Sequence, residues 1–274
     1  MRIKHLSLIF FLFLIIPSFV KAGEIPLPRD VNSKAYVIKS EKDGMWEKTL
    51  IVQFPERRRV FSTIEGFLDV TTVINHSAQP ELWMEVCEKL KTKDEVGGKI
   101  YIKNIKEKVA SRLGIRSSDI AQFATAADMD NLAVMTKKHE PFIVTAMVTA
   151  GARSNAVRTG VDEGKHIEGE EPKGTVNILI LTNARLTDGA MARAIITATE
   201  AKTAAFEDLK VPSTYTKDVQ ATGTGTDNVI VVSGTSERLV TYTGGHSKMG
   251  ELIGKAVHEA VMEALKKQNG FKKQ

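Results

Sequence analysis

The stretch ATGTGTD, at residues 221–227, gathers two glycines, three threonines and an aspartate directly before the apolar run NVIVV. Loops of this composition often bind phosphate, but a P-loop needs a lysine after its last glycine, and a dinucleotide-binding loop must open a helix. No lysine follows Gly225, and NVIVV has the β-branched composition of a strand. The stretch is therefore a tight turn that brings Thr224, Thr226 and Asp227 into a small volume. Such a turn suits a polar pocket and a purely structural role equally well.

A lysine on an apolar helix stripe is the second unusual feature. Within TATEAKTAAFEDL, at residues 197–209, Glu200 and Lys202 are two positions apart and therefore point away from each other. Lys202 shares its stripe with Ala198 and Ala205, whereas Glu200 lies on a more polar side. Either Lys202 extends along the surface to reach solvent, or a carboxylate such as Asp227 holds it over a polar pocket.

His246 follows two glycines in the segment YTGGHSKMG, immediately before the last predicted helix. An imidazole takes up and releases protons near neutral pH, so His246 is a candidate general acid or base. The alternative is a histidine in a surface loop. The neighbouring glycines would let a ligand or another backbone come close, which favours the functional interpretation.

The segment TAGARSNAVRTG, at residues 149–160, supplies the amide of Asn155 and the guanidinium of Arg158, which suit hydrogen bonding to carbonyl and amide groups. Ser154 lacks the Gly-x-Ser-x-Gly setting of a serine nucleophile. Six histidines and one cysteine show no spacing typical of metal ligands, so we expect neither a metal site nor a cofactor.

The elements around these segments predict a mixed α and β (α+β) fold, in which helices pack on a β-sheet in a single layered domain. The N-terminal half is rich in strands, and the C-terminal half holds two long helices. Strands are predicted at residues 35–39, 49–54, 59–64, 69–74, 141–149, 175–182, 229–233 and 239–242, and helices at 81–91, 99–113, 189–209 and 249–265. The last helix has an apolar residue at i, i+3, i+4 and i+7 through four turns, so it should bury one face.

The N-terminus has the pattern of a secretory signal peptide. A basic start precedes an apolar run at residues 6–16, and small residues lead to a cleavage site after Ala22, which leaves residues 23–274 as the mature domain. We therefore expect an exported protein, periplasmic or otherwise extracytoplasmic, without stable membrane insertion after cleavage. An uncleaved anchor is the alternative, but the apolar run is shorter than the ~20 residues of a spanning helix.

Composition excludes other classes of protein. Cleavage removes Arg2, Lys4 and Lys21 and lowers the formal charge from +5 to +2, and no basic stripe with interleaved aromatic residues points to nucleic acid. The basic run at residues 56–59 is interpreted as a solvated strand end. Cys87, the single cysteine, falls in a predicted helix and is interpreted as a small buried residue.

Taken together, the motifs resemble the adenosylcobinamide amidohydrolase family over about residues 61–265. The likeness rests on ATAADM, TAGARSNAVRTG, GTVNILI, TATEAKTAAFEDL, ATGTGTD and YTGGHSKMGELIGKAV in this order. It implies hydrolysis of the amide that joins a corrin propionate to aminopropanol, either in adenosylcobinamide or in complete cobamides. The products would be adenosylcobyric acid and aminopropanol, for corrinoid salvage or remodelling. Residues 23–60 carry no part of the resemblance, and an export signal departs from what we expect of its members.

The resemblance and the residue chemistry together suggest a mechanism. His246 would activate water or a threonine hydroxyl and be oriented by Asp227 or Glu200, while Lys202 would stabilise the oxyanion. The corrin amides would bind to Asn155, Arg158 and Asn177, beside Thr224 and Thr226. In an alternative mechanism, Thr224 or Thr226 is a covalent nucleophile.

Two other functions fit the same residues. The first is an exported corrinoid-binding protein that delivers its ligand to a corrinoid transport system and does not need His246. The second is an amidase for another exported substrate.

Overall fold

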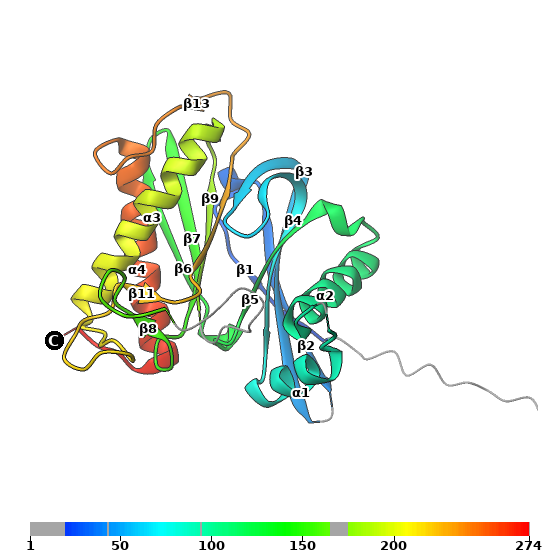
Figure 1. The fold of residues 1–274 in the computed structure, drawn as a ribbon. Coiled ribbons are helices and arrows are strands. Elements are labelled where there is room, and N and C mark those ends of the chain that lie inside the picture. The colour runs from blue at the N-terminus through cyan, green and yellow to red at the C-terminus, as the bar shows by residue number, and fades with distance from the viewer. Residues whose placement is uncertain (1–19, 43, 94, 165–174, 274) are drawn as a thin grey trace, which may run out of the picture.

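The structure is a computed structural model that describes residues 20–42, 44–93, 95–164 and 175–273. Its elements form four layers: two helices, two packed halves of one curled sheet, and two further helices (Figure 1). The predicted α+β class, with a strand-rich N-terminal half and two long C-terminal helices on the sheet, is confirmed. Most of residues 1–22, the predicted signal peptide, lies outside the described residues.

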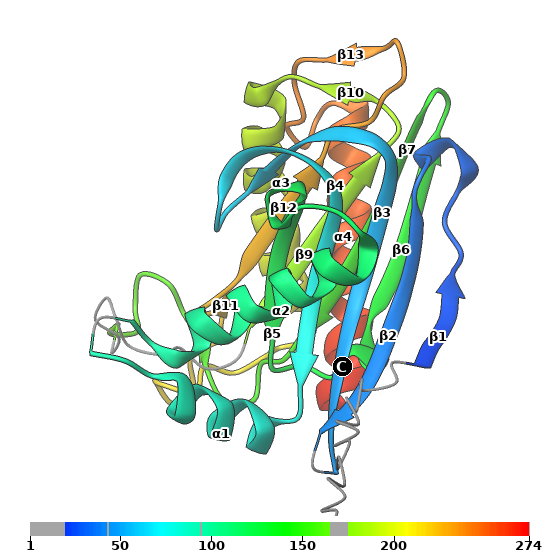
Figure 2. The same ribbon diagram turned by 90° about the vertical axis from the view of Figure 1, so that its right-hand side faces the viewer.

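The sheet has nine strands in the described part of the chain. Strand β3 connects the two halves of this sheet. Along one edge, β3 pairs with β2 near its start and with β12 near its end, and along the opposite edge it pairs with β4 (Figure 2). Pairs β4–β5 and β9–β12 are parallel, and the other pairs of this sheet are antiparallel. The strands are β1 (Val20–Ile25), β2 (Lys34–Lys42), β3 (Met45–Ser62), β4 (Gly66–Ala78), β5 (Ile120–Thr125), β6 (Ala133–His139), β7 (Phe142–Ala150), β9 (Val176–Thr182) and β12 (Asn228–Val232).

Strand β3 corrects one prediction. The sequence predicts two strands, at residues 49–54 and 59–64, separated at Pro55, but the structure has one strand of 18 residues. The pairing of β3 with β4 shifts register between Gln53 and Arg58. A bulge at this point lets the strand continue through Pro55, because proline has no N–H group to donate to the neighbouring strand.

The four α-helices have bounds near those predicted: α1 (Pro80–Leu90), α2 (Gly97–Leu113), α3 (Asp188–Asp208) and α4 (Lys248–Asn269). Hydroxyl side chains cap the two long ones. Thr187 Oγ1 accepts from Ala190 N at 3.2 Å at the start of α3, and Ser247 Oγ accepts from Gly250 N at 3.1 Å at the start of α4. Helix α2 begins earlier than predicted, at Gly97, where a Cβ atom would lie 1.7 Å from the Cys87 carbonyl oxygen.

Shorter elements complete the chain. Two-residue strands form the pairs β8 (Ala156–Val157) with β11 (Gly223–Thr224) and β10 (Arg185–Leu186) with β13 (Leu239–Val240). The 3-10 helices are η1 (Arg29–Val31), η2 (Ser117–Asp119) and η3 (Met129–Asn131).

Each interface between layers has its own hydrophobic core. One core lies between α1, α2 and strands β2–β5, where Cys87 is buried as predicted. A second fills the space between the two halves of the sheet, and a third packs α3 and α4 onto β7, β9 and β12. The apolar stripe of α4 lies in this third core, which confirms the prediction from its spacing. These cores explain how a chain with one cysteine is stabilised without an internal disulfide bond.

The basic run at residues 56–59 lies within β3 and not at a strand end, and it is solvated only in part: Glu56 and Arg57 are exposed as predicted, but Arg58 is not. Arg58 is buried and donates to the carbonyl oxygens of Val31, Asn32 and Ser233 at 3.2–3.3 Å. Arg58 therefore joins η1 to the loop that follows β12.

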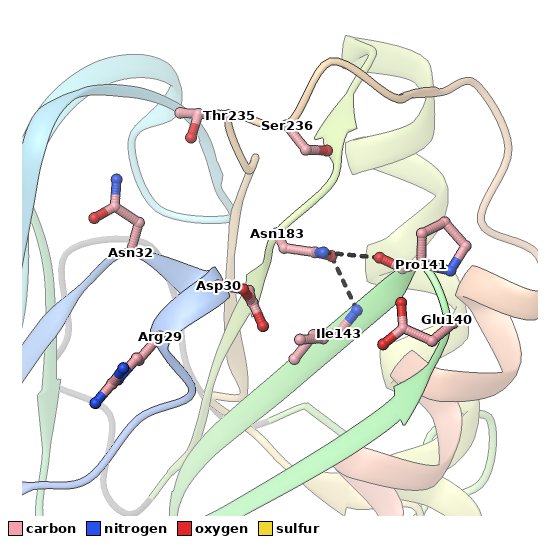
Figure 3. Close-up of a pocket in the computed structure, with 9 residues that line it drawn as sticks. All are labelled: Arg29, Asp30, Asn32, Glu140, Pro141, Ile143, Asn183, Thr235 and Ser236. Carbon is pink, nitrogen blue, oxygen red and sulfur yellow. Dashed lines mark hydrogen bonds between the residues drawn. The ribbon is translucent and has the colours of Figure 1, made fainter.

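A surface depression of about 480 Å³ lies beside this junction, at the C-terminal ends of β9 and β12. The loops at residues 29–32, 140–143, 183 and 235–236 line it. The side chain of Asn183 stabilises the turn between β6 and β7 there, because it donates to Pro141 O and accepts from Ile143 N, both at 2.9 Å (Figure 3).

Candidate active site

Two of the sequence motifs meet as a two-stranded ribbon. Strand β8 belongs to TAGARSNAVRTG and β11 to ATGTGTD, and they pair antiparallel with Thr224 opposite Ala156. Beyond the ribbon, Gly225 N donates to Asn155 O at 3.3 Å, and Asn155 Nδ2 lies 3.5 Å from Thr226 Oγ1. The ribbon lies at the N-terminal ends of β9 and β12, so about 20 Å of strand separates it from the depression in Figure 3.

At this end of the sheet, Asp227 accepts hydrogen bonds from Lys202, Thr224 and Val176, and these residues are called the Asp227 group. The Oδ2 atom of Asp227 accepts from Lys202 Nζ and from Thr224 N (3.0 Å), and its Oδ1 atom accepts from Val176 N (3.1 Å) and from Thr224 Oγ1. Lys202 is 8% exposed. The structure therefore decides between the two interpretations of Lys202: it does not extend to solvent, and Asp227 is its partner as suggested.

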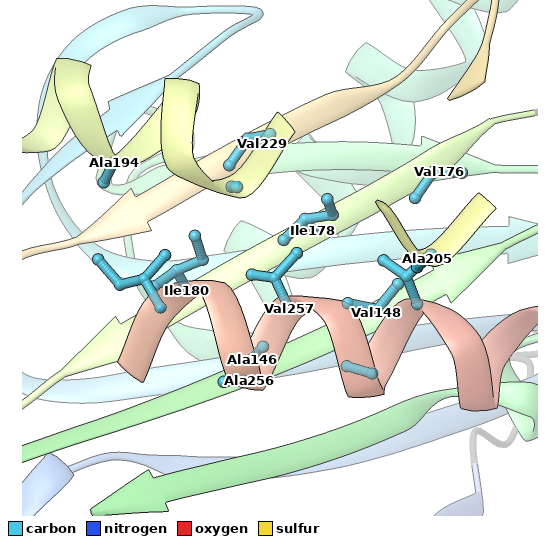
Figure 4. Close-up of a cluster of buried hydrophobic side chains, with 14 of the residues drawn as sticks. Ala146, Val148, Val176, Ile178, Ile180, Ala194, Ala205, Val229, Ala256 and Val257 are labelled. Carbon is cyan, nitrogen blue, oxygen red and sulfur yellow. The ribbon is translucent and has the colours of Figure 1, made fainter. Parts of the chain in front are cut away.

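Helix α3 holds Lys202 rigidly. Its buried alanines, among them Ala194 and Ala205, pack with Val257 of α4 against Ile178 of β9 (Figure 4). Because Lys202 lies on this buried stripe, its position relative to β9 and β12 is set by the core.

Gly223 makes room for the ion pair. A Cβ atom on Gly223 would lie 2.3 Å from Asp227 Oδ2 and 2.3 Å from Lys202 Nζ, closer than non-bonded atoms approach. At Gly225, two residues further on, such an atom would lie 4.0 Å from its neighbour Asn155 Nδ2. The first glycine of the turn is thus required by packing and the second is not.

A buried network of amides and hydroxyls joins the two halves of the sheet next to Asp227. Asn177 Nδ2 donates to Asn75 Oδ1 (3.1 Å) and to Ala124 O (2.7 Å), and Asn177 Oδ1 accepts from Thr175 Oγ1 (3.0 Å). Asn75 Nδ2 in turn donates to Thr149 Oγ1 (3.0 Å). The contacts of Asn177 use both its N–H donors within the protein, so they favour a role in positioning β9 over direct contact with a ligand.

The sequence singled out Asn177 but missed Asn75, Thr149 and Thr175. The available signal was weak: each is a polar residue within or beside an apolar β-run. Their partners are up to 102 positions away in the chain, so local patterns could not connect them.

His246 lies in a different part of the molecule. It is exposed, its ring is 5.2 Å from the ring of Tyr242, and the guanidinium of Arg193 lies 5.1 Å from that same ring. Arg193 precedes Lys202 by nine residues in α3, which corresponds to about 14 Å along the helix. Figure 1 shows the same separation, with β13 at one end of the molecule and β8 and β11 at the other. No contact among the described residues joins His246 to Asp227.

The remaining predicted residues lie around the ribbon and along α3. Glu200 is on the exposed side of α3, Thr226 and Arg158 are half-buried, and Asn155 is buried. Arg158 N donates to Asp162 Oδ2 at 2.6 Å, which closes the turn after β8. The structure thus brings together Lys202, Asp227, Thr224, Thr226 and Asn155, with Asn177 beneath them, and leaves Glu200 and His246 on outer surfaces.

A second buried polar chain, which the sequence did not reveal, lies under α1 and α2. Tyr101 O–H donates to Glu47 Oε1 (2.6 Å), His76 Nε2 lies 3.1 Å from the Tyr101 oxygen, and His76 Nδ1 lies 2.8 Å from Thr49 Oγ1. Because the Tyr101 proton points to Glu47, His76 donates from Nε2 and accepts from Thr49 at Nδ1.

This chain shifts the titration of its members. Burial lowers the pKa of His76 from 6.5 to about 4, so the ring is neutral at physiological pH. Burial also acts to raise the pKa of Glu47, but the hydrogen bond from Tyr101 and nearby positive charge outweigh it and hold the pKa below its ordinary value. Burial, together with the bond to Glu47, raises the pKa of Tyr101.

The described residues hold neither a membrane-spanning helix nor a cluster of metal ligands. No helix among them is long and apolar enough to cross a membrane. Within the same residues, no group of three or more His, Cys, Asp or Glu side chains is arranged to hold a metal ion.

The chain matches the family model of adenosylcobinamide amidohydrolase (CbiZ) over residues 34–273. It belongs to the adenosylcobinamide amidohydrolase family. The match begins well before residue 61, where the resemblance in the motifs began, so strands β2 and β3 lie within the matched range.

Relatives agree with this assignment. The chain is 47% identical over 257 residues to an uncharacterized protein of Methanocaldococcus jannaschii, an alignment that covers 87% of this chain and 95% of the relative. It is 30% identical over 165 residues to the adenosylcobinamide amidohydrolase of Methanosarcina mazei, covering 57% of this chain and 70% of that enzyme. A crystal structure of a protein from Pyrococcus horikoshii OT3 aligns with a TM-score of 0.39 and 10% identity, over 80% of this chain and 77% of that one. At this score and identity, the structural likeness supports no conclusion.

Membership of the amidohydrolase family gives the geometry its chemical context. A family of amidohydrolases acting on adenosylcobinamide implies a corrinoid substrate. The Asp227 group combines a carboxylate, an ammonium and a threonine hydroxyl at the end of a rigid sheet, and these are groups that amide hydrolysis can use.

Proposed function

We propose that this protein hydrolyses the amide between the corrin propionate and aminopropanol in adenosylcobinamide, giving adenosylcobyric acid and aminopropanol. The observation that carries the proposal is the family match over residues 34–273, which contains all the motifs around Asp227. Complete cobamides contain the same amide and are included as substrates, so the reaction would serve salvage or remodelling of corrinoids.

The Asp227 group supports this reaction chemically. The carboxylate is fixed by four donors, one of which is the ammonium of Lys202, and only 10% of the Lys202 side chain and 14% of the Asp227 side chain are exposed. Charges placed in this way act strongly on a carbonyl that develops negative charge, because little water screens them. Asn155, Thr226 and Arg158 border the group and are assigned to bind the amides at the periphery of the corrin.

His246 is assigned a separate role. Its distance from Asp227 along α3 argues against a direct proton relay between the two. A corrin ring with its side arms is wide enough to reach from the ribbon toward Tyr242 and His246, so His246 can contact the substrate without taking part in bond cleavage.

The test is product analysis. The purified full chain is incubated at substoichiometric concentration with adenosylcobinamide, cobinamide without the adenosyl ligand, adenosylcobalamin and a panel of peptide amides, and released aminopropanol is quantified by mass spectrometry. We expect aminopropanol from the corrinoids and a loss of at least about 100-fold in Asp227→Asn. Corrinoid binding without release of aminopropanol over hours would show that the protein is a corrinoid-binding protein and not an enzyme. Cleavage of peptide amides alone would indicate an amidase of another class.

We also propose that the protein is exported and works beside a corrinoid transport system. Support comes from the N-terminal basic start, the apolar run at residues 6–16 and the small residues before Gly23. Strand β1 begins at Val20, so cleavage after Ala22 would shorten β1 to its last three residues. Intact mass and N-terminal sequencing of the cellular protein should give Gly23 as the first residue. A full-length chain in the membrane fraction would establish the anchor instead, and one in the cytoplasm would refute export.

A further inference from the structure

The hydroxyl of Thr224 has a setting that differs from its neighbours in the turn. Thr224 Oγ1 donates to Asp227 Oδ1, and its backbone N–H donates to the other oxygen of the same carboxylate at 3.0 Å. Asp227 is in turn bonded to Lys202. Hydroxyl, carboxylate and ammonium therefore form one continuous chain, which the buried stripe of α3 holds in place.

The neighbouring threonines are bonded differently. Thr222 Oγ1 lies 3.3 Å from Val157 O, to which it donates, and it accepts from Thr159 N at 3.1 Å, as expected for a group that fixes the ribbon. Thr226 Oγ1 lies 3.5 Å from Asn155 Nδ2. A hydroxyl that donates to a carboxylate is poised to lose its proton when its oxygen attacks a carbon, because the acceptor is already in place.

We propose that Thr224 is the nucleophile of the hydrolysis and that the reaction passes through an ester on its Oγ1 atom. This inference rests on the function proposed above. In the first step, Oγ1 bonds to the amide carbon, its proton moves to Asp227, and the carbonyl oxygen becomes negative. The C–N bond then breaks, the nitrogen takes the proton from Asp227, and aminopropanol leaves. In the second step, water attacks the ester carbon and gives a proton to Asp227, the bond to Oγ1 breaks, Oγ1 recovers that proton, and the corrin carboxylate is released.

Lys202 and Gly223 act through Asp227. Lys202 pairs with the carboxylate at Oδ2, the oxygen that does not accept from the Thr224 hydroxyl, and fixes its orientation, while Gly223 leaves the space that this arrangement needs. Both are positioning residues.

The low exposure of Thr224 fits the substrate class. The residue is 7% exposed, but the next residue, Gly225, is exposed and carries no side chain to block the approach. A bulky ring cannot reach such an oxygen, whereas an amide at the end of a flexible propionate arm can. The structure thus favours substrates whose scissile amide extends away from the ring.

The test compares variants of the full chain that keep or remove the hydroxyl. Thr224→Val preserves the β-branched shape without the hydroxyl, Thr224→Ser preserves the hydroxyl, and Thr222→Val is the matched control in the same turn, at a hydroxyl that bonds only within the ribbon. We expect Thr224→Val to lose at least about 1,000-fold in kcat with substrate affinity unchanged, and Thr224→Ser to recover most of that loss. Thr222→Val should stay within about tenfold of the wild type. Thermal unfolding of each variant separates loss of chemistry from loss of fold.

Hydroxylamine provides the chemical readout. It cleaves an ester intermediate, so the wild type and Thr224→Ser should divide their product between adenosylcobyric acid and its hydroxamate. A wild type that releases aminopropanol but forms only the acid would overturn the proposal, as would a Thr224→Val variant with activity within tenfold of the wild type. These results would leave the amidohydrolase function intact. If instead the wild type releases no aminopropanol from any corrinoid, the proposed function itself fails.

Discussion

Replacing Gly223 with alanine should break the Lys202–Asp227 pair from within. The new methyl group would lie 2.3 Å from both Asp227 Oδ2 and Lys202 Nζ, so each atom must move by about 1 Å to reach ordinary contact. A shift of that size lengthens the 3.0 Å bond from Thr224 N to Asp227 beyond hydrogen-bonding range and separates the ion pair.

The expected cost follows from these two lost contacts. Hydrogen bonds to charged groups contribute about 1.5–3 kcal/mol each, and breaking a buried ion pair costs about 3–5 kcal/mol. Because neither partner is removed and both can relax partly, we expect Gly223→Ala to lower the free energy of unfolding by about 2–4 kcal/mol. For a chain of this size that corresponds to a melting temperature lower by about 5–10 °C.

Urea denaturation followed by circular dichroism measures this difference, and Gly225→Ala is the control. The control makes the same change in the same turn, at an exposed position where the new methyl group would lie 4.0 Å from Asn155 Nδ2, so its unfolding free energy should stay within about 0.5 kcal/mol of the wild type. Aminopropanol release should fall together with stability in Gly223→Ala. Gly225→Ala is a control for stability alone, because its methyl group would border the approach to Thr224. Equal stability of the two variants would refute the arrangement of Asp227 and Lys202 described above.

Three further predictions concern the other polar clusters. The pKa of His76 is about 4 in the folded chain, against its ordinary 6.5, so between these pH values the unfolded chain binds more protons than the folded chain. The free energy of unfolding should therefore fall, by at most about 3 kcal/mol, as the pH drops from 6.5 to 4. Replacing His76 with glutamine should flatten the profile of unfolding free energy between pH 6.5 and 4, and an unchanged slope would contradict the burial of the ring. Asn177→Leu should cost about 2–4 kcal/mol in urea denaturation, because it leaves Asn75 and the Ala124 carbonyl without their donor; a loss below 0.5 kcal/mol would show that water replaces the amide. His246→Ala should change kcat for aminopropanol release by less than about tenfold, and a loss of 1,000-fold would restore His246 as the general base.

Much of the fold was predictable because its signals are local. The apolar spacing of α3 and α4 marks a helix wherever it occurs in a chain. The α+β class follows from the order of these elements. Strand β3 was not predictable as one piece, because a proline normally ends a strand, and only the pairing with β4 shows that a bulge accommodates Pro55.

The candidate site was predictable in part for the same reason. Lys202 attracted attention because a lysine on an apolar stripe needs a partner, and Asp227 was a reasonable carboxylate to supply it. The packing role of Gly223 and the network of Asn75 and Asn177 depend on contacts between distant segments, which no periodicity records. His246 had the chemistry of a catalytic residue, but its distance from Asp227 is a property of the three-dimensional arrangement alone.

Strand β12 has a consequence for the order in which the chain folds. It lies between β3 and β9 and pairs with both. In the described part of the chain, the pairing of β12 with β3 is the only strand pairing that connects the two halves of the sheet. Residues 228–232 are made late in synthesis, so β3 keeps an open edge until most of the chain has emerged, and contacts such as that between Arg58 and Ser233 close loops of 175 residues. Loops of that length are slow to close, and folding rates fall as contacts become less local. The nascent N-terminal half should therefore stay incompletely folded for the whole of translation, and the final collapse should follow as one late cooperative event.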